Sequence, residues 1–162
     1  MREAQQTPSG SNSQSWLFTA IQNRDTLLRL NGLVRTGFQS YEPDDDYPAK
    51  HGAKKRAQEE SFNFYNHAPA LIIASNRSGY ENAMADCALA LENIFLTAES
   101  LGLGSCYINA LHWLRNDPGI REYLVELGIP REHTICSSAA VGYIAKPSPV
   151  PPRKANTTRI IE

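Results

Sequence analysis

The stretch of residues 81–110 constrains the fold more than any other part of the chain. It reads ENAMADCALALENIFLTAESLGLGSCYINA, and its apolar residues recur at helical spacing. One stripe consists of Met84, Cys87, Ala88, Leu91, Phe95 and Ala98, and a second of Ala85, Leu89 and Leu96. The spacing predicts a helix that is apolar on most sides and must be covered on most sides. Its cover is either the remainder of a globular domain or, in part, a second subunit.

Glycines mark the end of this predicted helix. Leu101 and Gly102 fit a left-handed cap, and residues 103–105 then turn the chain into a predicted buried strand at residues 106–108. The order is helix, glycine turn, strand. A dinucleotide-binding fingerprint needs its glycines after a strand and before a helix, so we exclude a Rossmann fold.

Length and charge narrow the class of protein. A chain of 162 residues, 41% of them hydrophobic, can bury a core of its own, so we expect one domain over residues 1–162. The formal net charge of −1 argues against a nucleic-acid or anionic-membrane surface, because such surfaces need clustered positive charge. No run of about 18 apolar residues is present, and residues 1–7 lack the apolar segment of a signal peptide. We therefore expect a cytoplasmic protein that does not bind nucleic acid or membranes.

The amino-terminal part of the chain shows a loop, a strand and a helix. The polar residues 7–14 predict a loop that leads into an apolar strand at residues 16–21, although such residues also form ordinary capped turns. Residues 23–25 can cap a helix that carries several leucines and ends near Gly37. The dense uncharged donors and acceptors of the loop make it the first candidate binding site.

The middle of the chain is less regular. Residues 39–56 contain Asp44–Asp46, a run of basic residues and two prolines, which predicts a solvated mobile loop or a lid. A short aromatic-rich helix is expected over residues 59–66. The compact apolar run at residues 69–75 suits a central strand.

The carboxyl-terminal part returns to regular structure. Asp117 and Pro118 predict the start of a helix that runs through Leu127, with Gly128 past its end. A last buried strand is expected at residues 134–143. The proline-rich segment that follows cannot form a helix or join a sheet interior, so residues 146–162 are predicted to be an extended arm that can reach a neighbouring subunit.

Residue types that carry chemistry are scattered along the chain. The cysteines Cys87, Cys106 and Cys136 are odd in number and lack C-x-x-C spacing, which favours reduced core thiols over disulfides or metal ligands. The four histidines form no pattern with a nucleophile or a metal site. We therefore expect no metal and no catalytic side chain, and if the protein is an enzyme, a cofactor carries the chemistry.

Several motifs together resemble the nitroreductase family of FMN oxidoreductases, in an order that spans nearly the whole chain. Residues 8–16, PSGSNSQSW, are similar to the family motif P-S-x-x-N-x-Q-P-W. Asp86, Ala90 and the LGLGSC sequence at residues 101–106 resemble the central helix and the glycine turn behind it. The closing strand and arm are matched by Ile129–Pro130, Ala140–Tyr143 and Arg153.

The resemblance implies an α+β fold of three layers, with a mixed but mainly antiparallel sheet flanked by helices, in an intertwined homodimer. It implies FMN as the cofactor, bound between subunits. The flavin-binding residues would be Pro8, Ser9, Gly10, Asn12 and Gln14 from the loop, Tyr107, Ile108, Asn109 and Ala110 along the ring, and Arg153 with Lys154 at the phosphate. In this alignment the backbone N–H of Asn109 reaches the hydride-accepting nitrogen.

The chain departs from the family pattern at three places. Family members usually begin with a helix that carries an Arg-Ser-x-Arg motif, some twenty or more residues ahead of the loop, whereas Pro8 is the eighth residue here. This sequence is expected to lack that helix, either because its start is truncated or because it is a short form that binds the phosphate with fewer charges. Ser15 replaces the usual proline before Trp16. The family's second patch of polar flavin contacts falls near residues 61–64, where Asn63 is the candidate.

Two functions are compatible with the sequence. The first is an enzyme in which NAD(P)H reduces FMN, which then reduces an electron-poor acceptor such as a nitroaromatic or a quinone. The second is a non-catalytic flavin-binding or interaction protein that kept the dimer and binds FMN weakly. The sequence selects neither the physiological acceptor nor NADH over NADPH.

Overall fold

The computed structural model describes residues 2–42, 47–146, 149–155 and 157–161. Four strands form one sheet in the order β1-β2-β4-β3, and every pairing in it is antiparallel. The strands are β1 (Leu17–Ile21), β2 (Ala70–Arg77), β3 (Leu103–Ile108) and β4 (His133–Tyr143). β2 and β4 occupy the centre, and most of their residues are buried. The α+β class and the mainly antiparallel sheet expected from the sequence are confirmed.

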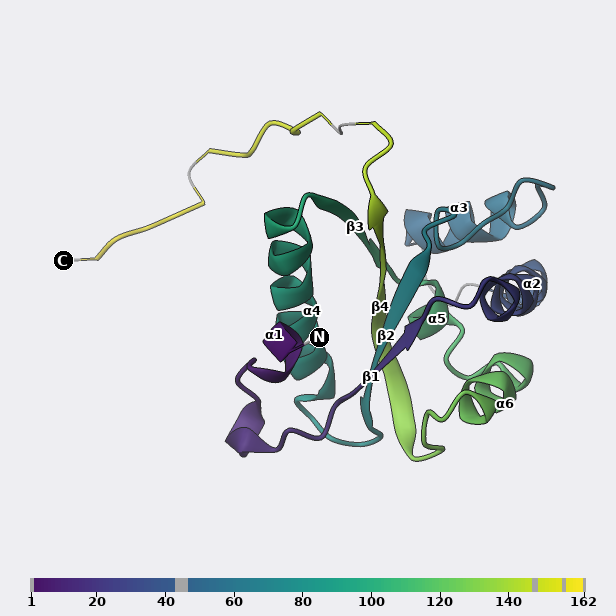
Figure 1. Cartoon of the computed structure of the whole chain (residues 1–162), viewed down its shortest axis with the longest axis horizontal. Coiled ribbons are helices and arrows are strands. Elements are labelled where there is room, and N and C mark those ends of the chain that lie inside the picture. Colours follow the sequence, from purple (N-terminus) through teal and green to yellow (C-terminus); the bar gives the residue numbers. More distant parts are fainter. Residues whose placement is uncertain (1, 43–46, 147–148, 156, 162) are drawn as a thin grey trace.

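One face of the sheet is covered by α4 (Ala83–Ser100), against which the four-residue helix α1 (Arg2–Gln5) packs (Figure 1). The core on this side joins buried side chains of α4 with those of the two central strands. Its members include Ala4, Ile72, Cys87, Leu91 and Cys136. The long predicted helix at residues 81–101 is therefore confirmed as α4, and it packs on the centre of the sheet.

The opposite face carries the remaining helices, so the molecule has three layers (Figure 1). These helices are α2 (Arg24–Ser40), α3 (Pro48–Arg56), α5 (Ala110–Trp113) and α6 (Pro118–Glu126). The larger of the two cores lies here, and it includes Leu30, Phe38, Leu71, Leu111 and Ile135. Two capping residues expected from the sequence are confirmed: Asn23 accepts a hydrogen bond from the Thr26 N–H, and Asp117 accepts one from the Ile120 N–H.

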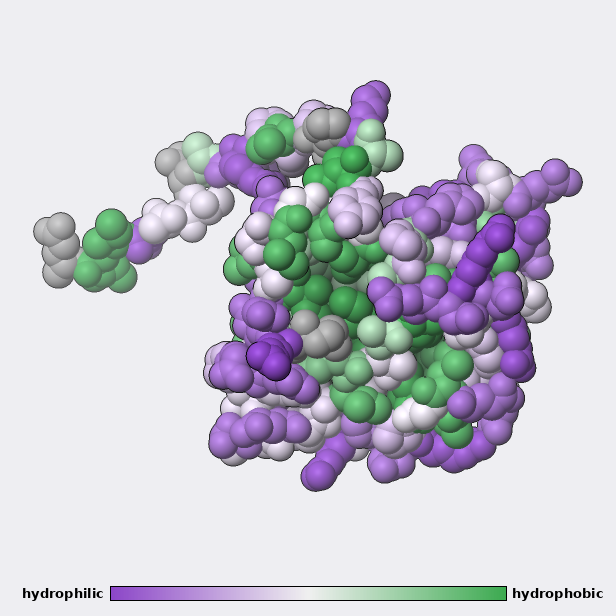
Figure 2. Space-filling view, in the orientation of Figure 1, coloured by the Kyte–Doolittle hydropathy of each residue, from purple (hydrophilic) through white to green (hydrophobic). Residues whose placement is uncertain are grey.

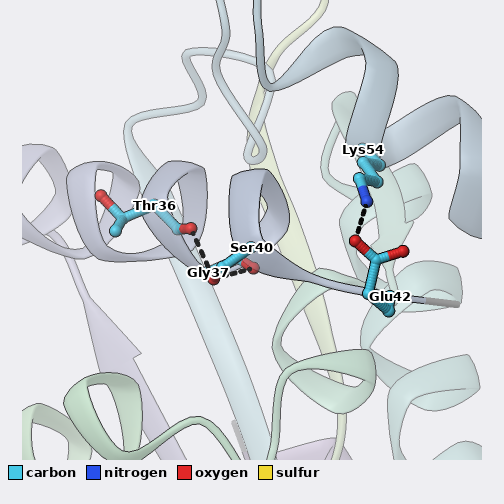
Figure 3. A network of polar contacts seen from close by, with 5 residues as sticks. All are labelled: Thr36, Gly37, Ser40, Glu42 and Lys54. Carbon is cyan, nitrogen blue, oxygen red and sulfur yellow. Dashed lines mark hydrogen bonds and ion pairs between the residues drawn. The ribbon is translucent and has the colours of Figure 1, made fainter.

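The connection between α2 and α3 corrects the prediction of a long mobile loop over residues 39–56. α2 continues past Gly37 to Ser40, whose hydroxyl donates to the carbonyls of Thr36 and Gly37 at 3.2 Å each (Figure 3). Pro48 lies in the first turn of α3, where its missing N–H is no loss. Lys54 of α3 pairs with Glu42 at 2.6 Å (Figure 3). The Asp44–Asp46 run lies outside the described residues.

The predicted aromatic-rich helix at residues 59–66 is wrong, because this segment is a series of turns. The Asn63 side chain accepts hydrogen bonds from the backbone N–H groups of Tyr65 and His67. Asn66 and His67 then take left-handed conformations, each with φ of 55°. A side chain that hydrogen-bonds the local backbone in this way competes with a helix.

The strand after the core helix is also not buried as predicted. β3 is an edge strand, and Ser105, Cys106 and Tyr107 on it are exposed. Cys106 is therefore not a core thiol, whereas Cys87 and Cys136 are buried and unbridged as expected.

One side of α4 is left uncovered by the rest of the described chain. Leu89 and Leu96 of α4 are 52% and 60% exposed, and Leu101, directly after the helix, is 68% exposed, although the sequence pattern requires cover for this helix. Figure 2 shows hydrophobic surface over the region in which α4 and the sheet lie in Figure 1. The described residues thus bury only part of the apolar surface of α4.

Candidate functional site

The loop at Pro8–Gln14 has an unusual backbone. Residues 10–12 form one turn of 3-10 helix, and Ser11, Asn12 and Gln14 have positive φ angles of 51°, 54° and 46°. Left-handed conformations cost roughly 1–3 kcal/mol each for residues other than glycine, and they cluster at functional sites. The side chains of Ser11, Asn12, Ser13 and Gln14 are nevertheless exposed. The loop therefore presents a row of neutral polar groups to its surroundings from a fixed, strained backbone.

Hydrogen bonds inside the loop maintain this shape. The Ser9 hydroxyl accepts from the Gln14 N–H at 3.0 Å, and the Gln14 amide donates to the Asn12 side chain at 2.8 Å. At the end of the loop, the Ser15 hydroxyl donates to the side chain of the buried Asn76 at 2.8 Å. The serine that replaces the usual proline at position 15 thus has a structural role.

Two side chains near the start of α4 contact the same loop. The buried Asp86 carboxylate accepts from the Gly10 N–H at 3.0 Å, and the Tyr80 hydroxyl lies 3.0 Å from the Gly10 carbonyl. The loop at residues 8–14 is therefore attached to the layer that contains α4.

The second group of candidate residues lies elsewhere, around a pocket of about 520 Å³. The predicted segment Tyr107–Ala110, at the end of β3 and the start of α5, forms one wall. The other walls come from α2, α3, the turn segment 61–66 and α5; their members include Phe38, Arg56, Asn63, Asn66 and Trp113. The volume falls in the range of small-molecule sites, roughly 300–1,000 Å³.

Buried hydrogen bonds hold the segment Tyr107–Ala110 in place. The Ser138 hydroxyl of β4 donates to the Ile108 carbonyl at 3.0 Å. Nδ1 of His112 lies 2.9 Å from the Ile135 carbonyl, so a proton on Nδ1 attaches α5 to β4. Burial lowers the pKa of His112, the hydrogen bond to the Ile135 carbonyl offsets part of this effect, and the charges of Arg115 and Lys50 lower the pKa further. The net direction is downward, so the neutral imidazole is favoured.

The turn segment 61–66 on the other side of the pocket is held by a residue that the sequence analysis missed. Asn31 of α2 donates to the Phe62 carbonyl at 3.1 Å and accepts from the Phe64 N–H at 3.0 Å. The predicted candidate Asn63 does line the pocket, but its side-chain oxygen is used within the turn. Asn66 and Arg56 also line the pocket and were not predicted, because a lone polar residue outside a motif gives no signal in the sequence.

The loop and the pocket lie far apart within one chain. The loop at residues 8–14 leads into β1 at one edge of the sheet, whereas Tyr107–Ala110 follows β3 at the other edge. Three strand spacings separate these edges, or roughly 14 Å. Trp16 packs in the core on the α4 side, and Ala110 packs in the core on the α2 side. Among the described residues, no member of the loop lines the pocket.

The predicted phosphate partners lie in neither place. Arg153 and Lys154 are exposed in the carboxyl-terminal arm, whose described residues have no regular secondary structure. In Figure 1 this arm leads away from the layers. A role for either residue depends on what the arm contacts.

Two negative findings apply to the part of the chain that the structure describes. In it, no group of three or more His, Cys, Asp or Glu side chains is arranged to hold a metal ion. No helix there is long and apolar enough to cross a membrane.

Comparison with known proteins finds relatives over nearly the whole chain. The sequence model of the Nitroreductase family matches residues 1–143. A curated protein from Archaeoglobus fulgidus, whose name includes the words NAD(P)H nitroreductase, is 24% identical over 151 residues. That match covers 88% of this chain and 69% of the archaeal protein.

Two solved structures have the same fold. A nitroreductase with bound FMN from Bacteroides fragilis is 37% identical, with a TM-score of 0.88 over 99% of this chain and 83% of that chain. A nitroreductase with bound FMN from Desulfitobacterium hafniense is 20% identical, with a TM-score of 0.81 and the same coverage.

Proposed function

Because this chain belongs to the nitroreductase family, we propose that it is an FMN-dependent oxidoreductase. Its reductant is NAD(P)H, and its acceptor is an electron-poor molecule such as a nitroaromatic or a quinone. The observation that carries the proposal is the likeness to the B. fragilis nitroreductase, which binds FMN and is 37% identical over nearly all of this chain. When bound, FMN takes up a hydride from NAD(P)H and passes the electrons on to the acceptor.

The residues of this chain suit a flavin. The loop at residues 8–14 offers neutral hydrogen-bonding groups, including the side chains of Asn12 and Gln14, which stabilise negative charge without titrating. The Tyr107–Ala110 segment offers backbone groups along one wall of a pocket of suitable size. Arg56 brings a positive charge and Glu59 a negative charge to the same pocket. No side chain is required as a general acid or base.

The separation of the loop from the pocket supports a homodimer. One chain places the two groups of residues at opposite edges of the sheet, with the loop on the α4 side and Ala110 on the α2 side. Two copies of the chain can bring one loop and one pocket to the same ligand. The exposed leucines of α4 supply an apolar surface for such a copy. We propose that the loop at residues 8–14 of one subunit and the Tyr107–Ala110 pocket of its partner form each flavin site.

The carboxyl-terminal arm fits the same arrangement. Arg153 and Lys154 are exposed on an extended segment that can reach a neighbouring subunit. We assign Arg153, assisted by Lys154, to the phosphate of FMN, because a guanidinium group binds phosphate through two parallel hydrogen bonds. The cytoplasmic location expected from the sequence stays a prediction.

The test is a spectrum of the purified protein followed by reduction. Protein incubated with FMN and freed of excess ligand should be yellow, with a flavin absorption band. Anaerobic addition of NADH or NADPH should bleach that band, and a nitroaromatic or a quinone should restore it. A protein that retains FMN but is reduced by neither nucleotide would support the non-catalytic flavin-binding alternative. A colourless protein that binds no FMN would contradict the proposal.

A further inference from the structure

We propose that Tyr80 and Asp86 form a clamp that positions the flavin-binding loop, and that the affinity for FMN depends on it. The inference rests on the proposed function, because the loop at residues 8–14 supplies flavin contacts only if FMN binds there. Neither residue needs to touch the flavin. Both act through the loop, and they are therefore positioning residues.

The clamp consists of several contacts around Gly10. The Gly10 N–H donates to both oxygens of Asp86, at 3.0 and 3.3 Å. The Tyr80 hydroxyl lies 3.0 Å from the second Asp86 oxygen and 3.0 Å from the Gly10 carbonyl. It also accepts a hydrogen bond from the Ser13 hydroxyl at 3.0 Å. The N–H and the carbonyl of Gly10 are thus held by side chains that lie 76 and 70 positions away in the sequence.

Burial makes these contacts matter for the loop. Asp86 is 3% exposed in the first turn of α4, and its carboxylate accepts hydrogen bonds from the Gly10 N–H and the Tyr80 hydroxyl. A buried carboxylate that loses a donor is costly, so this group strongly favours the conformation that brings Gly10 to it. Tyr80 is placed by the short turn between β2 and α4, in which its N–H donates to the Arg77 carbonyl.

The close approach also explains the glycine. A Cβ atom at position 10 would lie 2.2 Å from the Asn82 side chain and 2.7 Å from the Tyr80 hydroxyl. A side chain at this position would therefore displace the Asn82 amide and the Tyr80 hydroxyl of the clamp. The next residue begins the left-handed stretch of the loop, and the hydrogen bonds within the loop are local. Together with the Ser15–Asn76 hydrogen bond at the end of the loop, the clamp supplies long-range contacts that oppose relaxation of this strained backbone.

The test compares Tyr80→Phe and Asp86→Ala with wild type in the full-length protein. Tyr123→Phe is the matched control, because it removes a tyrosine hydroxyl that bonds the Thr26 carbonyl on the opposite side of the sheet. The dissociation constant for FMN is measured by quenching of flavin fluorescence. The thermal midpoint of the apoprotein and the hydrogen exchange of peptides that cover residues 8–16 are measured on the same variants.

We expect Tyr80→Phe to weaken FMN binding about three- to tenfold and Asp86→Ala by at least as much. Asp86→Asn, which keeps one acceptor oxygen, should recover part of the loss. Tyr123→Phe should stay within about twofold of wild type at a similar thermal midpoint. Exchange in residues 8–16 should rise only in the clamp variants. In a protein that already carries Asn12→Ala and Gln14→Ala, Tyr80→Phe should weaken FMN binding by a smaller factor than in wild type, because its effect passes through the side chains of Asn12 and Gln14.

The inference is overturned if wild type binds FMN and Tyr80→Phe binds it equally well, or if the Tyr123→Phe control loses the same affinity. If Asp86→Ala does not fold, Tyr80→Phe decides the matter alone. A wild-type protein that binds no FMN contradicts the proposed function, and the role of the clamp in flavin binding fails with it. If only the clamp hypothesis is wrong, wild type still binds FMN and is still reduced. The two negative outcomes can therefore be told apart.

Discussion

At the scale of single residues, Arg153 is the side chain whose role depends most on a contact outside its own chain. It is exposed in the arm, where an isolated charge contributes little. If it binds phosphate, Arg153→Ala should weaken FMN binding about tenfold to a hundredfold and leave riboflavin binding unchanged. Arg159→Ala, in the same arm, is the matched control and should change neither. An equal effect on both ligands, or none on FMN, would remove Arg153 from the site.

His112 gives a prediction about pH. Its pKa is lowered from the usual 6.5 because it is buried, so the unfolded chain binds a proton that the folded chain resists. Its contribution to stability is present above pH 6.5 and is lost as the pH falls toward the lowered pKa of the folded state. His133 has a pKa lowered mainly by burial, and it acts in the same direction.

We therefore expect the free energy of unfolding, measured in urea, to fall between about pH 7 and pH 5.5, and to fall less in His112→Gln. His51→Gln is the control, because it removes a different histidine and shows how far the loss of any histidine changes the pH dependence. An identical pH dependence in wild type and His112→Gln would contradict the assignment of this effect to His112.

At the scale of elements, the sequence predicted those whose ends are marked by local chemistry. Asn23 and Asp117 cap their helices, and both helices were expected. α3 was missed because charges and prolines obscured it, although Pro48 lies where a helix tolerates proline. The helix expected near Asn63 was wrong because one side chain redirects the local backbone. Aromatic spacing carries no information about such a bond.

The candidate site was predictable only where a motif marks it. The loop around Asn12 and the segment around Asn109 were identified from their motifs. In the structure the loop is exposed and has a strained backbone, and the segment around Asn109 lines a pocket. Asn31, Asn66 and Arg56 come together only through the packing of α2, α3 and a turn, which no single stretch of sequence encodes. The roles of all these residues toward FMN stay predictions.

The exposed face of α4 leads to a prediction about assembly. Leu89 and Leu96 are more than half exposed on a helix whose sequence requires cover, and stable homodimers bury on the order of 2,000 Å² or more. Wild type should sediment as a dimer at micromolar concentration, and a Leu89→Lys, Leu96→Lys variant should shift toward monomer. Leu28→Lys, at a leucine that is 49% exposed on α2, should remain dimeric. A stable wild-type monomer would count against the proposed dimer.

At the scale of the whole molecule, the central claim is that each flavin site combines the loop of one subunit with the pocket of the other. Two variants can each damage one half. Asn12→Ala with Gln14→Ala removes the polar side chains of the loop, and Ser61→Trp fills the pocket from an exposed position in its lining. Alone, each variant should form dimers in which both sites are defective.

The most direct measurement is the FMN content after the two variants are unfolded and refolded together. Random assembly makes half of the dimers mixed, and each mixed dimer has one site built from two intact halves. The account predicts that the mixture recovers about a quarter of the wild-type flavin content, whereas neither variant alone does. If refolded wild type regains its flavin and the mixture binds no more FMN than the separate variants, the flavin site lies within one chain and the account is contradicted.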